Sequence, residues 1–203
     1  MHFKIPLYEP LIGSLEKKNV NECLNTNWIS SKGKFVSLFE NKFKKFVKVP
    51  YAVSVCNGTA ALHLALLALR IKENDEVLVP TFTYVATVNA IKYVRAKVKF
   101  IDSKLNDWQI DEDEIEKKIT KKTRALIVPH IYGQVCNIQK ISKICKKNKI
   151  FLIEDCAESI GTYYKKTHVG NFGDISTFSF FGSKTITTGE GGMIVTKKKN
   201  LSK

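Results

Sequence analysis

Short apolar runs alternate with longer amphipathic stretches along most of the chain. Seven runs rich in Val, Ile, Leu and Phe predict β-strands, and they span 51–56, 75–80, 96–102, 124–130, 150–156, 174–180 and 191–196. The stretches between them predict helices near 13–25, 35–47, 58–70, 83–93, 111–119 and 137–148. Asp111 and Glu114 have the spacing of a capping box, which predicts the start of the helix over 111–119.

A series of strand, helix and strand predicts a parallel sheet with right-handed crossovers. The first strands are near-continuous apolar runs, which is typical of strands covered by helices on both faces. The last two strands are joined by a loop without a full helix, so one of them is expected to be antiparallel to the rest. The predicted fold is α/β, with ligands bound where the strands end.

The composition narrows the class of protein. A chain of 203 residues with 44% hydrophobic residues can bury one sizeable core. No apolar run is long enough to cross a bilayer, and MHFKIPLYEP lacks the apolar region of a secretory signal. The five cysteines lack metal-site spacing, and Cys56 and Cys156 fall in strand-like runs, which predicts buried free thiols. A cytoplasmic location without a membrane partner follows as an expectation.

The net charge of +14 comes mainly from lysines spread along helices and helix ends. Such a charge attracts nucleic acid or an anionic metabolite. No nucleic-acid-binding module is recognisable, and no regular aromatic pattern separates the lysines. We therefore interpret them as a solvated surface that weakly attracts anions, and expect no nucleic-acid partner.

Unusual residues follow several predicted strands. After the first strand, Gly58 permits a tight turn, and Thr59 and Ala60 open a helix rich in Ala and Leu. Free amides and the helix dipole favour an anion at such a helix start. An ordinary Thr-capped helix is the alternative.

Tyr84 follows the second strand, where an aromatic ring either stacks on a planar ligand or packs in the core. Asp155 ends a predicted strand directly after Glu154, and Glu158 follows three residues later. Carboxylates at such a position need a partner, for instance a cation or a protonated ring nitrogen. The alternatives are a helix cap and an exposed acid, and no second ligand cluster indicates a metal.

Lys184 lies in the loop FSFFGSKTITTGEGGM. A Walker A motif is excluded because Ser183, not Gly, precedes the lysine. Apolar surroundings disfavour the ammonium form of a lysine, as Schiff-base chemistry requires, and the nearby Ser179 is a candidate phosphate ligand. A surface lysine in a hairpin is the alternative. Taken together, a helix start, an aromatic, an acid and an amine indicate a site for pyridoxal 5′-phosphate (PLP).

The segments NGTAALHLAL, PTFTYVATVNAI, PHIYGQ, LIEDCAESIG and GDISTFSFFGSKTITTGEGGM occur in this order. Together they resemble the DegT/DnrJ/EryC1/StrS family of PLP-dependent sugar aminotransferases, over nearly the whole chain. The resemblance implies the type I aspartate aminotransferase fold and a homodimer with active sites at its interface. It also implies transfer of an amino group, usually from glutamate, to a keto sugar linked to a nucleoside diphosphate.

By this resemblance, Lys184 is the Schiff-base lysine and proton shuttle, Asp155 pairs with the pyridinium nitrogen and Glu158 lies near the ring hydroxyl. Tyr84 stacks on the ring. The phosphate ligands are then Gly58, Thr59, Ala60 and Ser179.

The opening of the chain and the lysine loop resemble family members that aminate a GDP-linked 4-keto-6-deoxy sugar at C4. Residues within that opening are expected to contact the substrate: Trp28, Ser30, Ser31 and Lys32. Related dehydratases carry His in place of the lysine, so Lys184 favours an aminotransferase. A non-catalytic protein that binds PLP or a nucleotide sugar, and a PLP-dependent sugar dehydratase, remain as alternatives.

Residues 1–203 are expected to form an N-terminal segment and the PLP-binding large domain. Family members continue into a C-terminal small domain, which contributes substrate contacts and completes the neighbouring subunit's pocket. That domain is expected to be absent from this chain, which is consistent with a truncated product and with exposed apolar surface.

Overall fold

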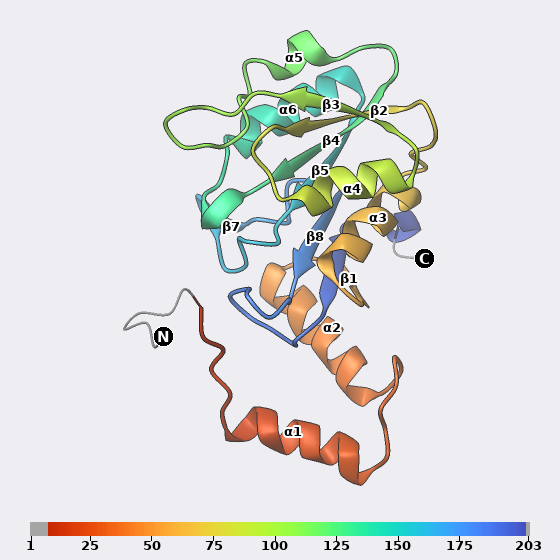
Figure 1. Cartoon of the computed structure of the whole chain (residues 1–203), viewed down its shortest axis with the longest axis vertical. Coiled ribbons are helices and arrows are strands. Elements are labelled where there is room, and N and C mark those ends of the chain that lie inside the picture. Colours follow the sequence, from red (N-terminus) through yellow and green to blue (C-terminus); the bar gives the residue numbers. More distant parts are fainter. Residues whose placement is uncertain (1–7, 202–203) are drawn as a thin grey trace.

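The computed structural model of the protein describes residues 8–201. Its centre is a seven-stranded sheet with the order β1-β9-β8-β5-β4-β2-β3 (Figure 1). The strands are β1 (Tyr51–Val55), β2 (Glu76–Pro80), β3 (Lys97–Ile101), β4 (Thr123–Pro129), β5 (Phe151–Asp155), β8 (Ile175–Ser179) and β9 (Gly192–Thr196). All seven predicted strands are confirmed, and each boundary lies within about one residue of the predicted one.

Strand directions also agree with the sequence pattern. The neighbouring pairs β2–β3, β2–β4, β4–β5 and β5–β8 are parallel. Strand β9 is antiparallel to both of its neighbours, β8 and β1. The expected antiparallel strand is therefore β9, which follows the lysine-bearing loop and returns between two strands of the opposite direction.

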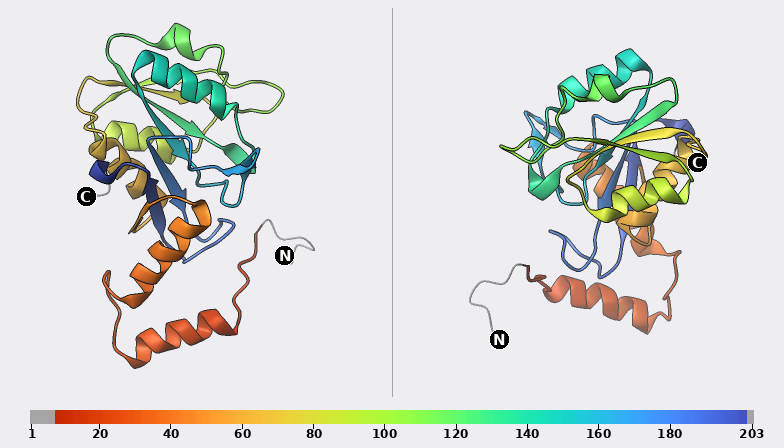
Figure 2. Two further views of the ribbon diagram at one scale, coloured as in Figure 1. Left: turned by 180° about the vertical axis from the view of Figure 1, so that it is seen from behind. Right: turned by 45° about the horizontal axis from the view of Figure 1, so that its top comes forward.

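Helices cover both faces of the sheet, and in the right-hand view of Figure 2 α4 and α6 lie on opposite sides of it. The helices are α1 (Ser14–Asn25), α2 (Lys34–Val47), α3 (Gly58–Ala68), α4 (Val85–Tyr93), α5 (Ile115–Lys118) and α6 (Ile138–Asn148). Alternate residues of each strand enter different cores, as the strand period of two requires. Ile153 packs with α3 and α4, whereas Leu152 packs with α5 and α6.

Helix α5 is shorter than predicted, and the prediction of a capping box formed by Asp111 and Glu114 is wrong. The Asp111 side chain accepts a hydrogen bond from the amide of Asp113 at 3.0 Å, which forms a turn before the helix. Glu114 instead binds Lys117 with its carboxylate, at 2.6 Å. An Asp side chain competes with the helix for nearby amides, so the chain turns here and the helix begins only at Ile115.

Several smaller features differ from the sequence pattern or were not predicted by it. A two-stranded hairpin of β6 (Tyr163–Tyr164) and β7 (Thr167–His168) follows β5, and 3₁₀ turns occupy Ile131–Gly133 and Lys199–Leu201. All five cysteines are free, but two of them are not buried as predicted: Cys56 is exposed after the end of β1, and Cys23 on α1 is only partly buried. Among residues 8–201, no helix has both the length and the apolar character needed to span a membrane.

Helix α1 lies apart from the layers around the sheet, at the bottom of Figure 1. None of its residues is buried. It nevertheless carries large apolar side chains that are more than half exposed: Leu15, Val20 and Leu24. An amphipathic helix without a packed face needs another surface for stability.

Candidate active site

A cavity of about 490 Å³ opens where the strands of the sheet end. It is bounded by the start of α3 after β1, the start of α4 after β2, the end of β5, the end of β8 and the lysine loop. Residues expected to bind the cofactor line it from all of these elements: Gly58, Thr59, Tyr84, Asp155, Glu158, Ser179 and Lys184. The fold therefore brings together side chains that are more than 120 positions apart in sequence.

The start of α3 forms one wall of the cavity. The amides of its first residues, Gly58 and Thr59, have no acceptor within the helix, as at any helix start. Gly58 lies directly against the end of β8, since a Cβ added to it would be 2.8 Å from the Cβ of Ser179. Backbone amides and a hydroxyl thus share a tight corner, which is suited to an anion.

Ala60 differs from the expectation. Its amide donates to the side chain of Asn57 at 2.8 Å, because Asn57 is the N-cap of α3. This residue is also not among those that line the cavity within the described part of the chain. The cap satisfies the third amide of the helix, so a ligand at this corner is left with Gly58 and Thr59.

Lys184 points into the cavity beside Tyr84 and Glu158. Its Nζ lies 5.8 Å from the centre of the Tyr84 ring and 3.3 Å from Oε1 of Glu158. Its side chain is only 19% exposed. The other oxygen of Glu158, Oε2, accepts the amide of Tyr132 at 3.0 Å. The acid is therefore held with one oxygen free to face the amine.

Asp155 lies deeper in the cavity and is 6% exposed. Its Oδ2 accepts the hydroxyl of Thr87 at 2.9 Å, and its Oδ1 accepts the amide of Ala157 at 3.1 Å. Burial raises the pKa of Asp155, and the bonds from Thr87 and Ala157 and the charge of Lys184 act against that rise. Two of the carboxylate's roughly four acceptor positions are used, which leaves room for another donor.

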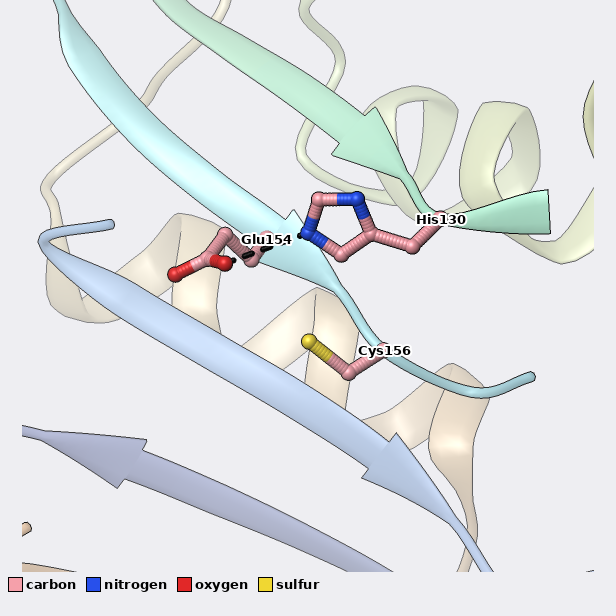
Figure 3. Close-up of side chains that lie close together, drawn as sticks. All are labelled: His130, Glu154 and Cys156. Carbon is pink, nitrogen blue, oxygen red and sulfur yellow. Dashed lines mark hydrogen bonds and ion pairs between the residues drawn. The ribbon is translucent and has the colours of Figure 1, made fainter. Parts of the chain in front are cut away.

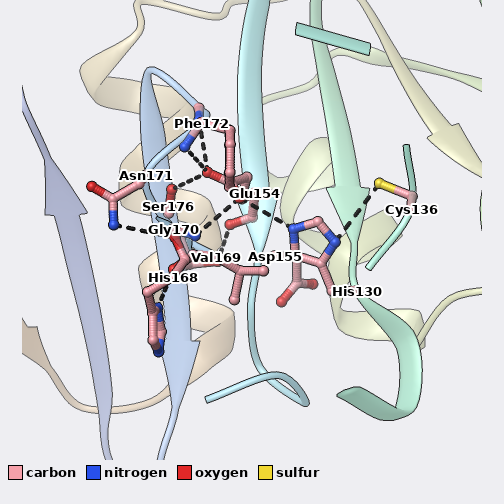
Figure 4. Close-up of polar contacts among 12 residues, drawn as sticks. His130, Cys136, Glu154, Asp155, His168, Val169, Gly170, Asn171, Phe172 and Ser176 are labelled. Carbon is pink, nitrogen blue, oxygen red and sulfur yellow. Dashed lines mark hydrogen bonds and ion pairs between the residues drawn. The ribbon is translucent and has the colours of Figure 1, made fainter. Parts of the chain in front are cut away.

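Glu154 precedes Asp155 but faces the opposite side of the sheet. Its oxygens accept the amides of Gly170, Phe172 and Gly173 at 2.7–2.9 Å. Two side chains complete the shell around it, Nε2 of His130 and the hydroxyl of Ser176, both at 3.1 Å (Figure 4). Burial pushes the pKa of Glu154 upward, but His130 and the amide donors outweigh burial and hold it below its ordinary value. Glu154 is a structural acid.

Three buried side chains have the composition of a metal site: His130, Glu154 and Cys156 (Figure 3). Their possible ligand atoms lie within 4.8 Å of one another. However, the hydrogen bonds described above already occupy the Glu154 oxygens, and burial raises the pKa of the Cys156 thiol well above its usual range. A saturated carboxylate and a protonated thiol are poor ligands, so the donor set does not fit a resident metal.

The four residues expected to contact the substrate lie in the loop between α1 and α2. Trp28 is 54% exposed and its Nε1 donates to the carbonyl of Lys32, whose amide in turn donates to Oγ of Ser30 at 3.3 Å. Ser31 lies in the same exposed turn. Within the described chain, none of these residues lines the cavity. Their role in binding substrate stays a prediction.

Residues not anticipated from the sequence also shape the site. Asn57 caps α3, Tyr132 anchors Glu158 through its amide, and Thr87 binds Asp155. Tyr132 has a positive φ of 52° and lines the cavity. The Asn-Gly-Thr sequence carried a signal for the cap, whereas the threonine in a mostly apolar helix start had no distinguishing pattern.

A lysine in the loop between β8 and β9 and an aspartate at the end of β5 face one cavity beside a helix start, which is the arrangement expected of a PLP-dependent transferase. Residues 10–203 match the DegT/DnrJ/EryC1/StrS aminotransferase family, and the chain belongs to that family. The expected α/β fold of the family is confirmed.

Known relatives are similar over nearly the whole chain. It is 57% identical over 197 residues to GDP-perosamine synthase from Escherichia coli O157:H7, covering 97% of this chain and 54% of that relative. An aminotransferase structure from Psychrobacter cryohalolentis aligns with a TM-score of 0.91 at 33% identity, covering 95% of this chain and 49% of that one. A GDP-4-keto-6-deoxymannose-3-dehydratase with a trapped PLP-glutamate geminal diamine aligns with a TM-score of 0.91 at 32% identity. The alignment covers 97% of this chain and 52% of the dehydratase. The chain thus spans about half the length of the relatives it matches.

Proposed function

We propose that this chain is the PLP-binding large domain of a nucleotide-sugar aminotransferase. The amino acceptor is a 4-keto-6-deoxy sugar linked to a nucleoside diphosphate, as the name of the GDP-perosamine synthase supports. The observation that carries the proposal is the convergence of Lys184, Asp155 and the start of α3 on one cavity of about 490 Å³. These three groups match the three polar features of PLP: the lysine its aldehyde, the buried acid its ring nitrogen and the anion site its phosphate.

The residues present fit this cofactor. The corner formed by Gly58, Thr59 and Ser179 is narrow and rich in hydrogen-bond donors, as a phosphate requires. Asp155 is buried, and it retains acceptor positions for a ring N–H. Tyr84 is exposed beside Lys184, where its ring is available for stacking on a planar group.

Each residue then has a distinct task. Lys184 would supply the amine that holds the cofactor and, once released, would move a proton between the amine-bearing carbon of the substrate and the aldehyde carbon of the cofactor. Asp155 stabilises a protonated ring nitrogen, and Glu158 accepts hydrogen bonds beside the ring hydroxyl. Bound PLP supplies an electron-withdrawing ring that stabilises negative charge on the substrate carbon. The partly buried position of the Lys184 side chain, which is 19% exposed, limits the access of water to its amine.

The remaining features of the proposal concern partners. Glutamate is the amino donor, in agreement with the PLP-glutamate species named for the similar dehydratase. The enzyme works as a homodimer in the cytoplasm, with neither nucleic acid nor membrane as a partner. Trp28, Ser30, Ser31 and Lys32 contact the sugar nucleotide in the assembled enzyme, which includes the small domain found in full-length relatives.

The first test is a titration of the chain with PLP, followed by absorbance, beside the variants Lys184→Ala and Lys143→Ala. Lys143 is exposed on α6 and serves as the matched control. We expect the unchanged chain and the control to develop a visible band, and borohydride to fix PLP on Lys184 as identified by mass spectrometry. Lys184→Ala is expected to show neither. Absence of the band from a folded, unchanged chain contradicts the proposed cofactor site.

A second measurement separates aminotransfer from the dehydratase alternative. The longer enzyme that contains this chain is given glutamate and GDP-4-keto-6-deoxymannose. An amino sugar and 2-oxoglutarate in equal amounts support the proposal. A deoxy sugar that lacks the C3 hydroxyl, without an amino sugar, points to dehydration instead.

A further inference from the structure

Thr87 is a buried polar residue that lines the cavity and that the proposed mechanism leaves without a task. It lies in the first turn of α4 and is completely buried. Its hydroxyl donates to Oδ2 of Asp155 at 2.9 Å, across 68 positions of sequence. A buried hydroxyl among apolar helix residues is costly unless it has a specific partner.

The hydroxyl of Thr87 has a second contact that fixes its direction. Oγ1 of Thr83, four residues earlier and just before α4, donates to Oγ1 of Thr87 at 3.1 Å. Because Thr87 accepts from Thr83, its single proton is directed at Asp155. The amide of Ala157 binds the other oxygen of Asp155. Donors on both oxygens restrict rotation of the carboxylate, so its remaining acceptor positions face the cavity.

We propose that Thr87 is a positioning residue that orients the Asp155 carboxylate toward a protonated ring nitrogen of the cofactor. This inference rests on the proposed function. Chains of hydroxyl donors stabilise a buried carboxylate more than one isolated donor does. The same helix start presents Tyr84 to the cavity, so α4 supplies both the stacking surface and the support for the acid.

The main charged groups that act on Asp155 are Lys184, from the lysine loop, and Glu158, from the segment after β5. Lys184 favours the carboxylate and Glu158 opposes it. Burial is the larger influence, and it favours the neutral acid. Loss of the Thr87 hydroxyl therefore removes the first of the influences that keep Asp155 charged.

Thr87→Val replaces the hydroxyl with a methyl group of similar size, and Thr87→Ser restores a hydroxyl. In the cofactor-free chain, ¹³C NMR of the Asp155 carboxyl is expected to show a higher pKa in Thr87→Val than in the unchanged chain, with Thr87→Ser near the unchanged value. PLP affinity, measured from the absorbance band, is expected to fall about tenfold in Thr87→Val and to recover in Thr87→Ser. The pH at which the visible band changes with loss of the ring-nitrogen proton is expected to be lower in the valine variant than in the unchanged chain.

Thr196→Val is the matched control, since Thr196 is also buried and its hydroxyl donates to the carbonyl of Asp174 and accepts the amide of Lys198, neither of which lines the cavity. If Thr87→Val does not fold by circular dichroism, Thr87→Ala serves in its place. An unchanged Asp155 pKa and unchanged PLP affinity in the valine variant overturn the inference. If the unchanged chain fails to bind PLP, the proposed function fails, and the NMR titration still decides whether Thr87 controls Asp155.

Discussion

Adjacent acids in this protein have different tasks because strand geometry separates them. Successive residues of a strand point to opposite faces. Glu154 therefore enters a shell of amide donors below the sheet, whereas Asp155 enters the cavity between the sheet and α4. The pKa of Glu154 is lowered by its donors, and the pKa of Asp155 is raised by burial. The fold keeps one acid charged for stability and holds the other ready for a cationic partner.

Glu154→Gln tests the structural role at the residue scale. An amide in this place presents hydrogen-bond donors to other donors, so we expect the free energy of unfolding at pH 7 to fall by about 3 kcal/mol. Because the folded pKa of Glu154 is below the unfolded value of about 4.3, its stabilisation is complete above that pH and is lost as the pH falls through the folded pKa. The difference between variant and unchanged chain should therefore shrink below about pH 4.

Urea denaturation at several pH values measures this difference. The exposed Glu73→Gln is the control, and it is expected to change stability by less than about 0.5 kcal/mol. A Glu154→Gln variant as stable as the unchanged chain at pH 7 contradicts the structural role of Glu154.

At the scale of single elements, the sequence predicted most of the fold and part of the site. The strands were predictable because each is an apolar run bounded by polar turns, as in IFLIED. The existence of helix α5 was also predictable, but its start was not, because the local turn of Asp111 outcompetes the capping box. The hairpin β6–β7 is too short for a periodic pattern. Ala60 was assigned to a phosphate because the Asn-Gly-Thr signal for a cap by Asn57, which binds the Ala60 amide, was not used. Thr87 depends on a contact between distant elements, which single-sequence patterns do not encode.

The junction between α3 and β8 gives a prediction for an element. In Gly58→Ala, the new Cβ would lie 2.8 Å from the Ser179 Cβ, so one of the two elements must shift. We expect PLP affinity to fall about tenfold or more, because the phosphate corner is displaced, and stability to fall by about 1–3 kcal/mol.

Pyridoxal, which lacks the phosphate, separates these effects: its binding is expected to be nearly the same in both proteins. Gly182→Ala is the control, since a Cβ at Gly182 meets no atom within 4 Å. Equal PLP affinity in Gly58→Ala and the unchanged chain rules out the assignment of this corner to the phosphate.

At the scale of the whole molecule, the described chain has well-covered layers around the sheet and one uncovered part. Helix α1 buries none of its residues, and its apolar side chains are exposed beside the loop that leads to α2. This loop carries Trp28 and Lys32, which lie apart from the cavity in a single chain. Both observations have one explanation under the proposed homodimer, namely that a second copy covers α1 and brings this loop of one copy near the cavity of the other.

Val20 and Leu24 are one turn apart on α1 and are 58% and 53% exposed, so together they form an apolar strip suited to an interface. The double variant Val20→Ser and Leu24→Ser is expected to move the chain from dimer to monomer in analytical ultracentrifugation, with a loss of dimer affinity of about 100-fold. The β-sheet signal in the circular dichroism spectrum is expected to remain unchanged, because α1 contributes no core residue. Lys18→Ser, an exposed change elsewhere on α1, is the control and should leave the dimer intact. A dimer of unchanged affinity in the double variant would show that α1 is not the contact, and Trp28 and Lys32 would then need another route to the substrate.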